Sequence, residues 1–205
     1  MKPAIKSKQV IESKAFSVIC GHRGGWVFTP RDLSRLGDPR SVGMALTRLC
    51  RKGVIRHLAR GLYDYPIDHP TFGRIPPSAD AVARALAKRD ASRLQPTGAY
   101  AANILGLSEQ VPTRIVFLTD GPSRRVKFGN QEIVLKKTTP RNMATAGRKS
   151  GDIIQALRHI GQDHITDTTL AILRRQLTPK DRAQLLKDLP HAPGWVADIL
   201  RRLAA

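Results

Sequence analysis

A segment of this chain over residues 38–53 carries cationic and hydroxyl side chains at helical spacing. Its apolar residues recur at i, i+3, i+4 and i+7, which predicts one buried helix face. The predicted buried face consists of Val42, Ala45, Leu46 and Leu49. The predicted solvent face carries Arg40, Ser41, Thr47, Arg48 and Arg51. Guanidinium groups and hydroxyls hydrogen-bond base edges and phosphates, so this face suits the major groove of DNA.

Both ends of this helix are marked in the sequence. Asp38 can accept hydrogen bonds from the first free backbone N–H groups, and Pro39 fits the first helical position. Gly53 favours the left-handed conformation that stops a helix, and Arg51 and Lys52 suit the negative end of its dipole. Such a helix can also have a merely solvated cationic face, so the flanking segments decide between the two interpretations.

The flanking segments follow the order of a winged helix-turn-helix domain. A predicted helix, a short strand and a second helix lead through a glycine turn to the helix over 38–53, and a β-hairpin with Arg60-Gly61 at its tip follows. The predicted ranges are 9–20, 26–28, 29–36 and 54–66. This order predicts DNA binding, with the helix over 38–53 in the major groove and the hairpin as the wing. The predicted DNA-binding residues are Arg31, Arg40, Ser41, Thr47, Arg48, Arg51, Lys52 and Arg60.

The predicted helix over 9–20 follows a short basic segment, and residues 1–8 are expected to be a flexible arm. The expected core residues of this helix are Val10, Phe16, Val18 and Ile19. Cys20 and Cys50 fall within apolar helical patterns. We therefore expect both to be buried free thiols in a reducing compartment.

The rest of the chain predicts a linker and a second domain. Residues 67–77 are rich in proline and lack periodicity, which predicts a linker or an extended crossing segment between a winged-helix domain over 1–66 and a domain over 78–205. The second domain begins with short helical and strand segments over 79–88, 94–98 and 99–107. Three strands then follow, and their turn residues predict an antiparallel meander. The strands are expected at 114–119, 124–128 and 132–137, and C-terminal helices at 153–160, 168–177, 180–189 and 195–203. The predicted fold class is therefore α+β.

The second and third of these strands are strongly cationic. Their basic residues are Arg124, Arg125, Lys127, Lys136 and Lys137. Charge of this kind can protect an edge strand from pairing with another chain. It can equally form a docking face for DNA or for an acidic partner, and the sequence leaves both interpretations open.

Net charge indicates the class of partner. The chain has 35 Lys and Arg against 16 Asp and Glu, a net charge of +19. The excess is +9 over residues 1–75, +7 over 76–148 and +3 over 149–205. A cationic excess of this size predicts a polyanionic partner, and nucleic acid comes first. No apolar run approaches the ~18 residues of a membrane span, so no membrane partner is expected.

Sequence motifs of catalysis are not found. Asp163, His164 and Asp167 lie close together, but no nucleophile with an orienting partner accompanies them, and Asp167 is more simply a helix-start residue. The chain has no phosphate-binding loop, zinc signature or nucleophile elbow. We therefore expect a protein that is not an enzyme and has no metal and no cofactor.

The layout of the chain resembles the AbiEi-type antitoxins of bacterial type IV toxin–antitoxin systems over roughly residues 9–200. The segments that carry the resemblance are 25–33, 42–49, 53–56, 60–63 and 96–108, with Gln110-Val111-Pro112. The resemblance implies that the winged helix binds and represses the operon's own promoter. It also implies that the C-terminal domain counteracts a nucleotidyltransferase-like toxin encoded next to it. On the family's basic recognition surface, the matching residues are Arg40, Thr47, Arg48, Arg51 and Arg60.

The leading hypothesis is therefore an antitoxin and transcriptional autorepressor in the bacterial cytoplasm, associated with the nucleoid. Its expected partners are double-stranded DNA of its own promoter and a nucleotidyltransferase-like toxin. A monomer that binds repeated half-sites is plausible. The alternative is a stand-alone regulator, or a plasmid-associated protein that binds nucleic acid without a toxin. The alternative without regulation predicts little sequence preference and a steep dependence on salt.

Overall fold

The computed structural model describes the backbone of residues 4–205 and side chains from Val10 onward. It divides into two compact units, each of which is described by itself. The first unit extends to Asp90 and includes residues 126–130, and the second consists of 91–125 and 131–205. The first unit thus continues past the predicted domain end at residue 66, because helix α3 (Ala79–Arg89) packs against strand β1 (Val27–Phe28).

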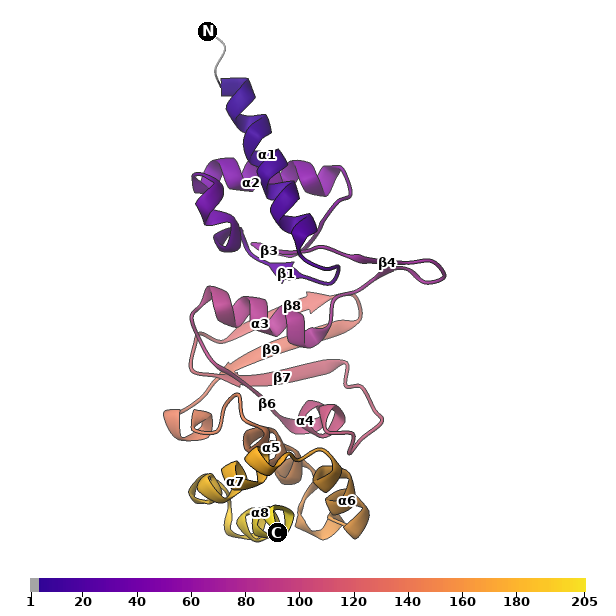
Figure 1. Ribbon diagram of the computed structural model, residues 1–205, viewed down its shortest axis with the longest axis vertical. Helices are drawn as coiled ribbons and strands as arrows, with labels where there is room; N and C mark the ends of the chain where they lie inside the picture. Colours follow the sequence, from indigo (N-terminus) through magenta and orange to yellow (C-terminus); the bar gives the residue numbers. More distant parts are fainter. Residues whose placement is uncertain (1–3) are drawn as a thin grey trace. The chain divides into compact units, whose positions relative to one another are not determined.

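The first unit combines helices with short strands (Figure 1). Its elements besides β1 and α3 are α1 (Ala4–Gly21), η1 (Pro30–Leu36), α2 (Pro39–Arg51), β2 (Arg56–Ala59), β3 (Leu62–Asp64), β4 (Ile67–His69) and β5 (Gly73–Ile75). Strands β1, β3 and β2 form an antiparallel sheet in that order. The predicted helix over 29–36 is a 3-10 helix, η1, and not an α-helix.

Helix α2 matches its prediction in both ends and in its buried face. The Oδ1 atom of Asp38 accepts the backbone N–H groups of Arg40 and Ser41, each at 3.0 Å. Gly53 follows the helix with a φ of +70°, the left-handed conformation expected of a stop. The buried residues of the helix are Val42, Ala45, Leu46 and Leu49.

Helix α1 buries one of its four predicted core residues. Ile19 is fully buried as predicted, whereas Val10, Phe16 and Val18 are 48%, 44% and 38% exposed. Ala15, which was not predicted, is fully buried. The small Ala15 side chain allows the close helix approach that a search for large apolar residues misses. Residues 4–8 of the predicted flexible arm are helical, and residues 1–3 lie outside the described residues.

Both cysteines are free thiols, but neither is buried as predicted. Cys20 lies on an exposed position of α1, and Cys50 is half-buried on α2. Desolvation raises the pKa of the Cys50 thiol above its ordinary value, and the nearby Asp64 carboxylate raises it further. The raised pKa keeps this thiol protonated and unreactive at neutral pH.

The proline-rich stretch predicted as a linker forms a hairpin instead. Strands β4 and β5 pair antiparallel, with Ile67 opposite Ile75 and Asp68 opposite Arg74. At the tip, Nδ1 of His69 accepts the backbone N–H groups of Thr71 and Phe72 at 3.2 and 3.3 Å. The prediction failed because a side-chain acceptor, and not an Asn-Gly pair, organises this turn.

The second unit combines a small sheet with helices that lie on one side of it (Figure 1). The strands are β6 (Leu94–Pro96), β7 (Arg114–Thr119), β8 (Arg124–Phe128) and β9 (Gln131–Lys137), of which β8 is shared with the first unit. The helices are α4 (Gly98–Ile104), η2 (Pro140–Met143), α5 (Lys149–Ile160), η3 (Gln162–His164), α6 (Asp167–Arg175), α7 (Pro179–Lys187), η4 (Leu189–His191) and α8 (Gly194–Ala204). Helices α4 to α8 supply the apolar core. The mixed α+β fold class is as predicted.

The strands of this sheet do not form the predicted antiparallel meander. Their order is β6-β7-β9-β8, and β9 pairs with β7 in parallel, with Ile115 opposite Ile133 and Phe117 opposite Leu135. The more apolar strand β9 takes the inner position, and the cationic strand β8 takes the edge, where its charged side chains remain hydrated. The turn after β7 reverses the chain direction, but the two strands that it joins, β7 and β8, are not neighbours in the sheet.

Candidate nucleic-acid interface

One side of α2 carries a row of side chains opposite its buried face. Its residues follow the helical repeat at i, i+4, i+7 and i+11. We call this row the α2 stripe, and it consists of Arg40, Met44, Thr47 and Arg51. Arg40, Thr47 and Arg51 are exposed and Met44 is half-buried. Sequence reasoning missed Met44, which its spacing from Arg40 and Thr47 could have revealed.

The α2 stripe is open to close approach by a ligand. Apart from its chain neighbours and the backbone of its own helix, a Cβ atom placed on Gly43 would meet no atom within 4 Å, so no other segment covers the helix there. The Thr47 hydroxyl donates to the carbonyl of Gly43 at 2.9 Å, which leaves its oxygen as an acceptor. Among the side chains that the structure describes, those of Arg40 and Arg51 have no ion-pair partner.

The other two predicted cations of this helix bind a carboxylate of α1. Glu12 accepts Arg48 Nη1 at 3.1 Å and Lys52 Nζ at 2.5 Å, and we call this group the Glu12 clamp. The Glu12 side chain is only 11% exposed. The hydrogen bond from Lys52, followed by that from Arg48, holds the pKa of Glu12 below its ordinary value. Arg48 and Lys52 therefore cross-link α1 and α2.

Glu12 was missed by sequence reasoning, although a signal existed. It is the only acidic residue of residues 1–31, and it lies within a helix next to a strongly cationic one. A single carboxylate in such cationic surroundings is expected to form an ion pair. Ser41, also predicted to contact DNA, is half-buried in the first turn of α2, where its N–H is bound by Asp38.

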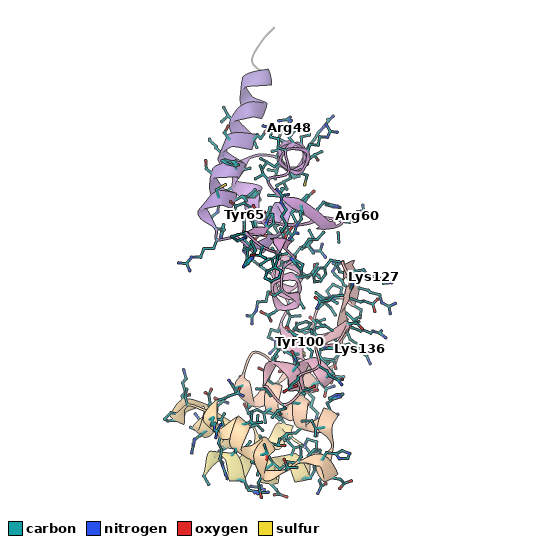
Figure 2. The ribbon with its side chains drawn as sticks, turned by 90° about the vertical axis from the view of Figure 1, so that its right-hand side faces the viewer. Arg48, Arg60, Tyr65, Tyr100, Lys127 and Lys136 are labelled. Carbon is teal, nitrogen blue, oxygen red and sulfur yellow. The ribbon has the colours of Figure 1, made fainter. Side chains whose placement is uncertain are left out.

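The hairpin β2–β3 presents Arg60 at its tip. Arg60 is exposed, and Gly61 beside it has a φ of +69°, a conformation that glycine adopts without strain. The hairpin is fixed at its base, where Arg56 binds the fully buried carboxylate of Asp64 through Nε at 3.1 Å and Nη2 at 2.5 Å. Figure 2 labels Arg60 at the hairpin, and Arg48 where α1 and α2 lie side by side. The Arg56–Asp64 ion pair therefore fixes the hairpin that carries Arg60 at its tip.

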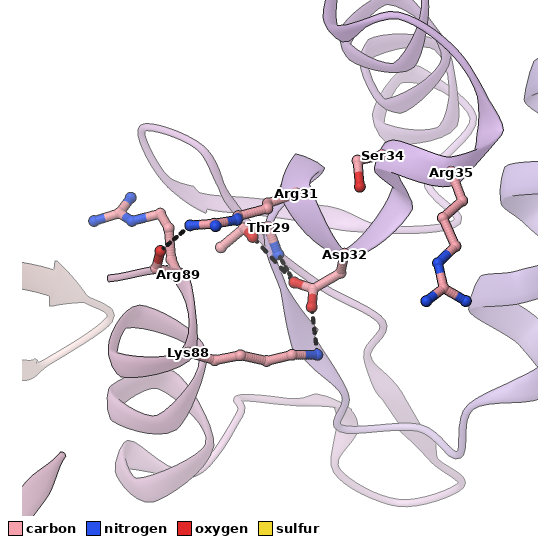
Figure 3. A pocket seen from close by; sticks show the side chains of 7 residues that line it. All are labelled: Thr29, Arg31, Asp32, Ser34, Arg35, Lys88 and Arg89. Atoms are coloured by element: carbon pink, nitrogen blue, oxygen red, sulfur yellow. Dashed lines mark hydrogen bonds and ion pairs between the residues drawn. The ribbon is translucent and has the colours of Figure 1, made fainter. Parts of the chain in front are cut away.

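Arg31 lies on a different surface from the α2 stripe. Its Nη1 donates to the backbone carbonyl of Arg89 at 2.7 Å, at a pocket between η1 and α3 (Figure 3). The pocket is lined by Thr29, Arg31, Asp32, Ser34, Arg35, Lys88 and Arg89. The predicted set of eight is thus divided among the stripe, the clamp, the hairpin tip, the first turn of α2 and this pocket.

The cationic strands make a second basic surface. Arg125, Lys127, Lys136 and Lys137 are exposed, and β8 is an edge strand. Glu132 lies between two arginines, 3.4 Å from Nε of Arg114 and 3.4 Å from Nε of Arg125. A shallow cavity of about 270 Å³ is lined by Ser123, Arg124, Arg125, Val134, Leu135 and Lys136. Lys127 and Lys136 are labelled in Figure 2.

The acidic cluster considered for catalysis is exposed. Asp163 and His164 lie on η3, and Asp167 begins α6, where it forms an ion pair of 3.5 Å with Arg202. Within residues 4–205, no group of three His, Cys, Asp or Glu side chains is placed to hold a metal ion. No helix in this described part of the chain is long and apolar enough to cross a membrane.

Comparisons with known proteins place the chain in a family. A search of curated proteins found no match. The crystal structure of the RV2827C protein from Mycobacterium tuberculosis is similar in fold, with a TM-score of 0.51 and 18% sequence identity. The similarity covers 95% of this chain and 76% of that one. A family profile described as a family of unknown function, DUF6088, matches residues 14–185, and the chain therefore belongs to that family.

Proposed function

We propose that this protein is a DNA-binding autorepressor whose first unit is a winged helix. In this proposal α2 lies in the major groove and the β2–β3 hairpin is the wing. The observation that carries it is the α2 stripe, in which two exposed arginines flank a threonine and a methionine on a rigid, capped helix. A cationic helix face of this shape, beside an arginine-tipped hairpin, suits duplex DNA better than a small ligand.

Each residue of the stripe has a contact suited to its chemistry. Arg40 and Arg51 would donate two hydrogen bonds each to O6 and N7 of guanine. Met44 and the methyl group of Thr47 would contact thymine methyl groups. Gly43 would let the helix backbone approach the bases closely, and Arg60 would bind a phosphate or enter the minor groove. Together, these contacts would give sequence-specific recognition of duplex DNA.

The Glu12 clamp supports recognition indirectly in this proposal. Because Arg48 and Lys52 bind Glu12, they orient α2 on α1 and do not contact bases in this proposal. Arg48, although predicted to contact DNA, is therefore a positioning residue in this proposal, and Arg40 and Arg51 read the bases. A fixed helix orientation matters because direct readout depends on side chains reaching particular base edges.

We further propose that the second unit counteracts a nucleotidyltransferase-like toxin in the bacterial cytoplasm, near the nucleoid. This part rests on the resemblance to AbiEi-type antitoxins. The exposed cations of β8 and β9 offer a surface for an acidic protein or for DNA. The alternative function is nucleic-acid binding without regulation. The same surface favours it, because the cations of β8 and β9 are far in sequence from the α2 stripe and could bind phosphates independently of it.

The test is the affinity of the full chain for the DNA upstream of its own gene and for a scrambled duplex at about 150 mM salt. Specific readers prefer their site by about 10³-fold or more. The expected result is a preference in that range, which disappears when Arg40 and Arg51 are replaced by alanine. Equal affinity of the wild type for both duplexes would instead support the alternative.

A separate experiment tests the antitoxin function. The nucleotidyltransferase-like gene next to this one, if present, is expressed with the wild type and with Arg40→Ala/Arg51→Ala. Both proteins should restore growth if the second unit acts on the toxin independently of DNA binding. Failure of both to restore growth would contradict the antitoxin function and leave the repressor function standing.

A further inference from the structure

The pocket between η1 and α3 has a volume of about 480 Å³ and a basic lining. All seven lining residues belong to the first unit. Figure 3 shows the Lys88 ammonium bound to Asp32, with the side chains of Ser34 and Arg35 on the η1 side of the pocket, apart from this carboxylate. The pocket joins an element before α2 to one that follows the β4–β5 hairpin, so sequence reasoning did not bring these residues together.

Asp32 organises the pocket and has both carboxylate oxygens engaged. Its Oδ2 accepts the Thr29 backbone N–H at 2.8 Å and the Thr29 hydroxyl at 3.0 Å, and its Oδ1 accepts Lys88 Nζ at 2.6 Å. Burial raises the pKa of Asp32, but the hydrogen bonds from Lys88 and Thr29 outweigh it and leave the pKa below its ordinary value. Asp32 is thus ionised at neutral pH and holds Lys88 in place.

The cations of the pocket have donors to spare. Lys88 uses one of three N–H groups on Asp32, and Arg31 uses one of five on the Arg89 carbonyl. Within the described side chains, Arg35 has no ion-pair partner. The Arg89 guanidinium is turned away, toward Asp90, at 3.3 Å. The three remaining cations and Asp32 leave a net positive charge in a concave site.

We propose that this pocket binds a phosphate group. Ser34, Arg35 and Lys88 would donate to its oxygens, and Arg31 would add charge from the other side of Asp32. A phosphate dianion suits a concave site that is lined by hydroxyl, guanidinium and ammonium donors, whereas a neutral ligand would leave these charges without compensation. The phosphate belongs either to the backbone of bound DNA, in which case the inference rests on the proposed function, or to a small phosphorylated ligand.

The experiment compares the wild type with Arg35→Ala/Lys88→Ala. The control is Arg158→Ala/Arg175→Ala, which removes the same charge from exposed positions of α5 and α6 in the second unit. Thermal unfolding checks that every variant folds, and the single variant Ser34→Ala removes a donor without removing charge. The full chain is used in both arms.

In the first arm, inorganic phosphate is titrated into each protein at constant ionic strength and followed by ³¹P NMR. Binding by the wild type that weakens at least tenfold in Arg35→Ala/Lys88→Ala, but not in the control, assigns the pocket to a small phosphorylated ligand. This arm contains no duplex, so it does not depend on the proposed DNA binding.

In the second arm, the upstream duplex carries one neutral methylphosphonate at a time. A position that costs the wild type about tenfold in affinity, and costs Arg35→Ala/Lys88→Ala nothing, assigns the pocket to a backbone phosphate. The proposal is overturned if the pocket variant matches the control in both arms. Retained phosphate binding by Arg40→Ala/Arg51→Ala separates the pocket from the α2 stripe.

Discussion

The two basic regions of this protein each contain one glutamate that binds two cations. On α1, Glu12 binds Arg48 and Lys52 at 3.1 and 2.5 Å. On β9, Glu132 lies 3.4 Å from both Arg114 and Arg125. In each region, the glutamate removes part of the positive charge from the surface. The cations that remain exposed differ between the two regions in residue type and in the secondary structure that holds them.

The cations that remain near α2 are arginines, and those that remain on the strands are lysines. Arg40, Arg51 and Arg60 lie on a capped helix and a tight hairpin. Lys127, Lys136 and Lys137 lie on two strands of a small sheet. Arginine has a planar fork that matches guanine and phosphate, whereas lysine is a flexible point charge. We therefore expect the first region to read sequence and the second to add affinity without selectivity.

The largest expected effect comes from Arg40→Ala/Arg51→Ala. Each bidentate contact to guanine is worth about 1–3 kcal/mol of discrimination, so the double variant should lose about 30- to 10⁴-fold in affinity for the upstream duplex. Its affinity for scrambled DNA should fall far less. Fluorescence anisotropy with both duplexes measures the two constants. An equal loss on both would refute the reading role of the stripe.

The next effect comes from Lys127→Ala/Lys136→Ala/Lys137→Ala. If these lysines neutralise phosphates, affinity should fall roughly tenfold on both duplexes, and the slope of log K against log salt should decrease by about 0.9 for each phosphate that is no longer neutralised. Anisotropy titrations at three salt concentrations measure the slope. Unchanged binding to both duplexes, together with lost rescue from the toxin, would assign the strands to a protein partner.

Smaller still is the effect expected of Glu12→Gln, which removes the carboxylate shared by Arg48 and Lys52. The free energy of unfolding should fall by about 1–2 kcal/mol, since Lys52 is largely exposed and its part of the clamp is weakened by solvent. Urea unfolding measures the change. Glu109→Gln, at an exposed position, is the matched control and should have little effect.

The clamp also predicts a dependence on pH. Because the folded pKa of Glu12 lies below its ordinary value of 4.5, its stabilisation is present above that pH and is lost as pH falls toward the lowered pKa. The stabilities of wild type and Glu12→Gln should therefore approach each other as the pH falls from 4.5 to below the lowered pKa. A difference that stays constant from pH 7 to pH 3 would show that packing, and not charge, explains the loss.

Local features were predictable from the sequence, and long-range ones were not. The ends and buried face of α2 follow from Asp38, Gly53 and a helical repeat within one segment. The clamp joins residues 36 positions apart, and the pocket needs Lys88, far from Asp32 in sequence. Neither pairing leaves a local signal.

The strand order of the sheet was also beyond local reasoning. The turn after β7 predicts a reversal of direction, but it does not determine whether the next strand pairs with β7. The insertion of β9 depends on the burial of Ile133 and Leu135 in the folded sheet. The three strands were located correctly because alternation and turn residues are properties of each segment alone.

The smallest expected effect is that of Arg60→Ala, at the tip of the β2–β3 hairpin. Removing one cation from a phosphate should weaken binding to both duplexes by about fivefold and reduce the salt slope by about 1. Arg60→Lys retains the charge and distinguishes two modes of binding. If Arg60→Lys binds DNA as tightly as the wild type, the partner of residue 60 is a phosphate. If Arg60→Lys loses affinity only for duplexes whose flanking DNA is rich in A·T pairs, Arg60 inserts into a narrow minor groove. If neither variant changes affinity or slope, Arg60 does not touch DNA, and the hairpin is not a wing.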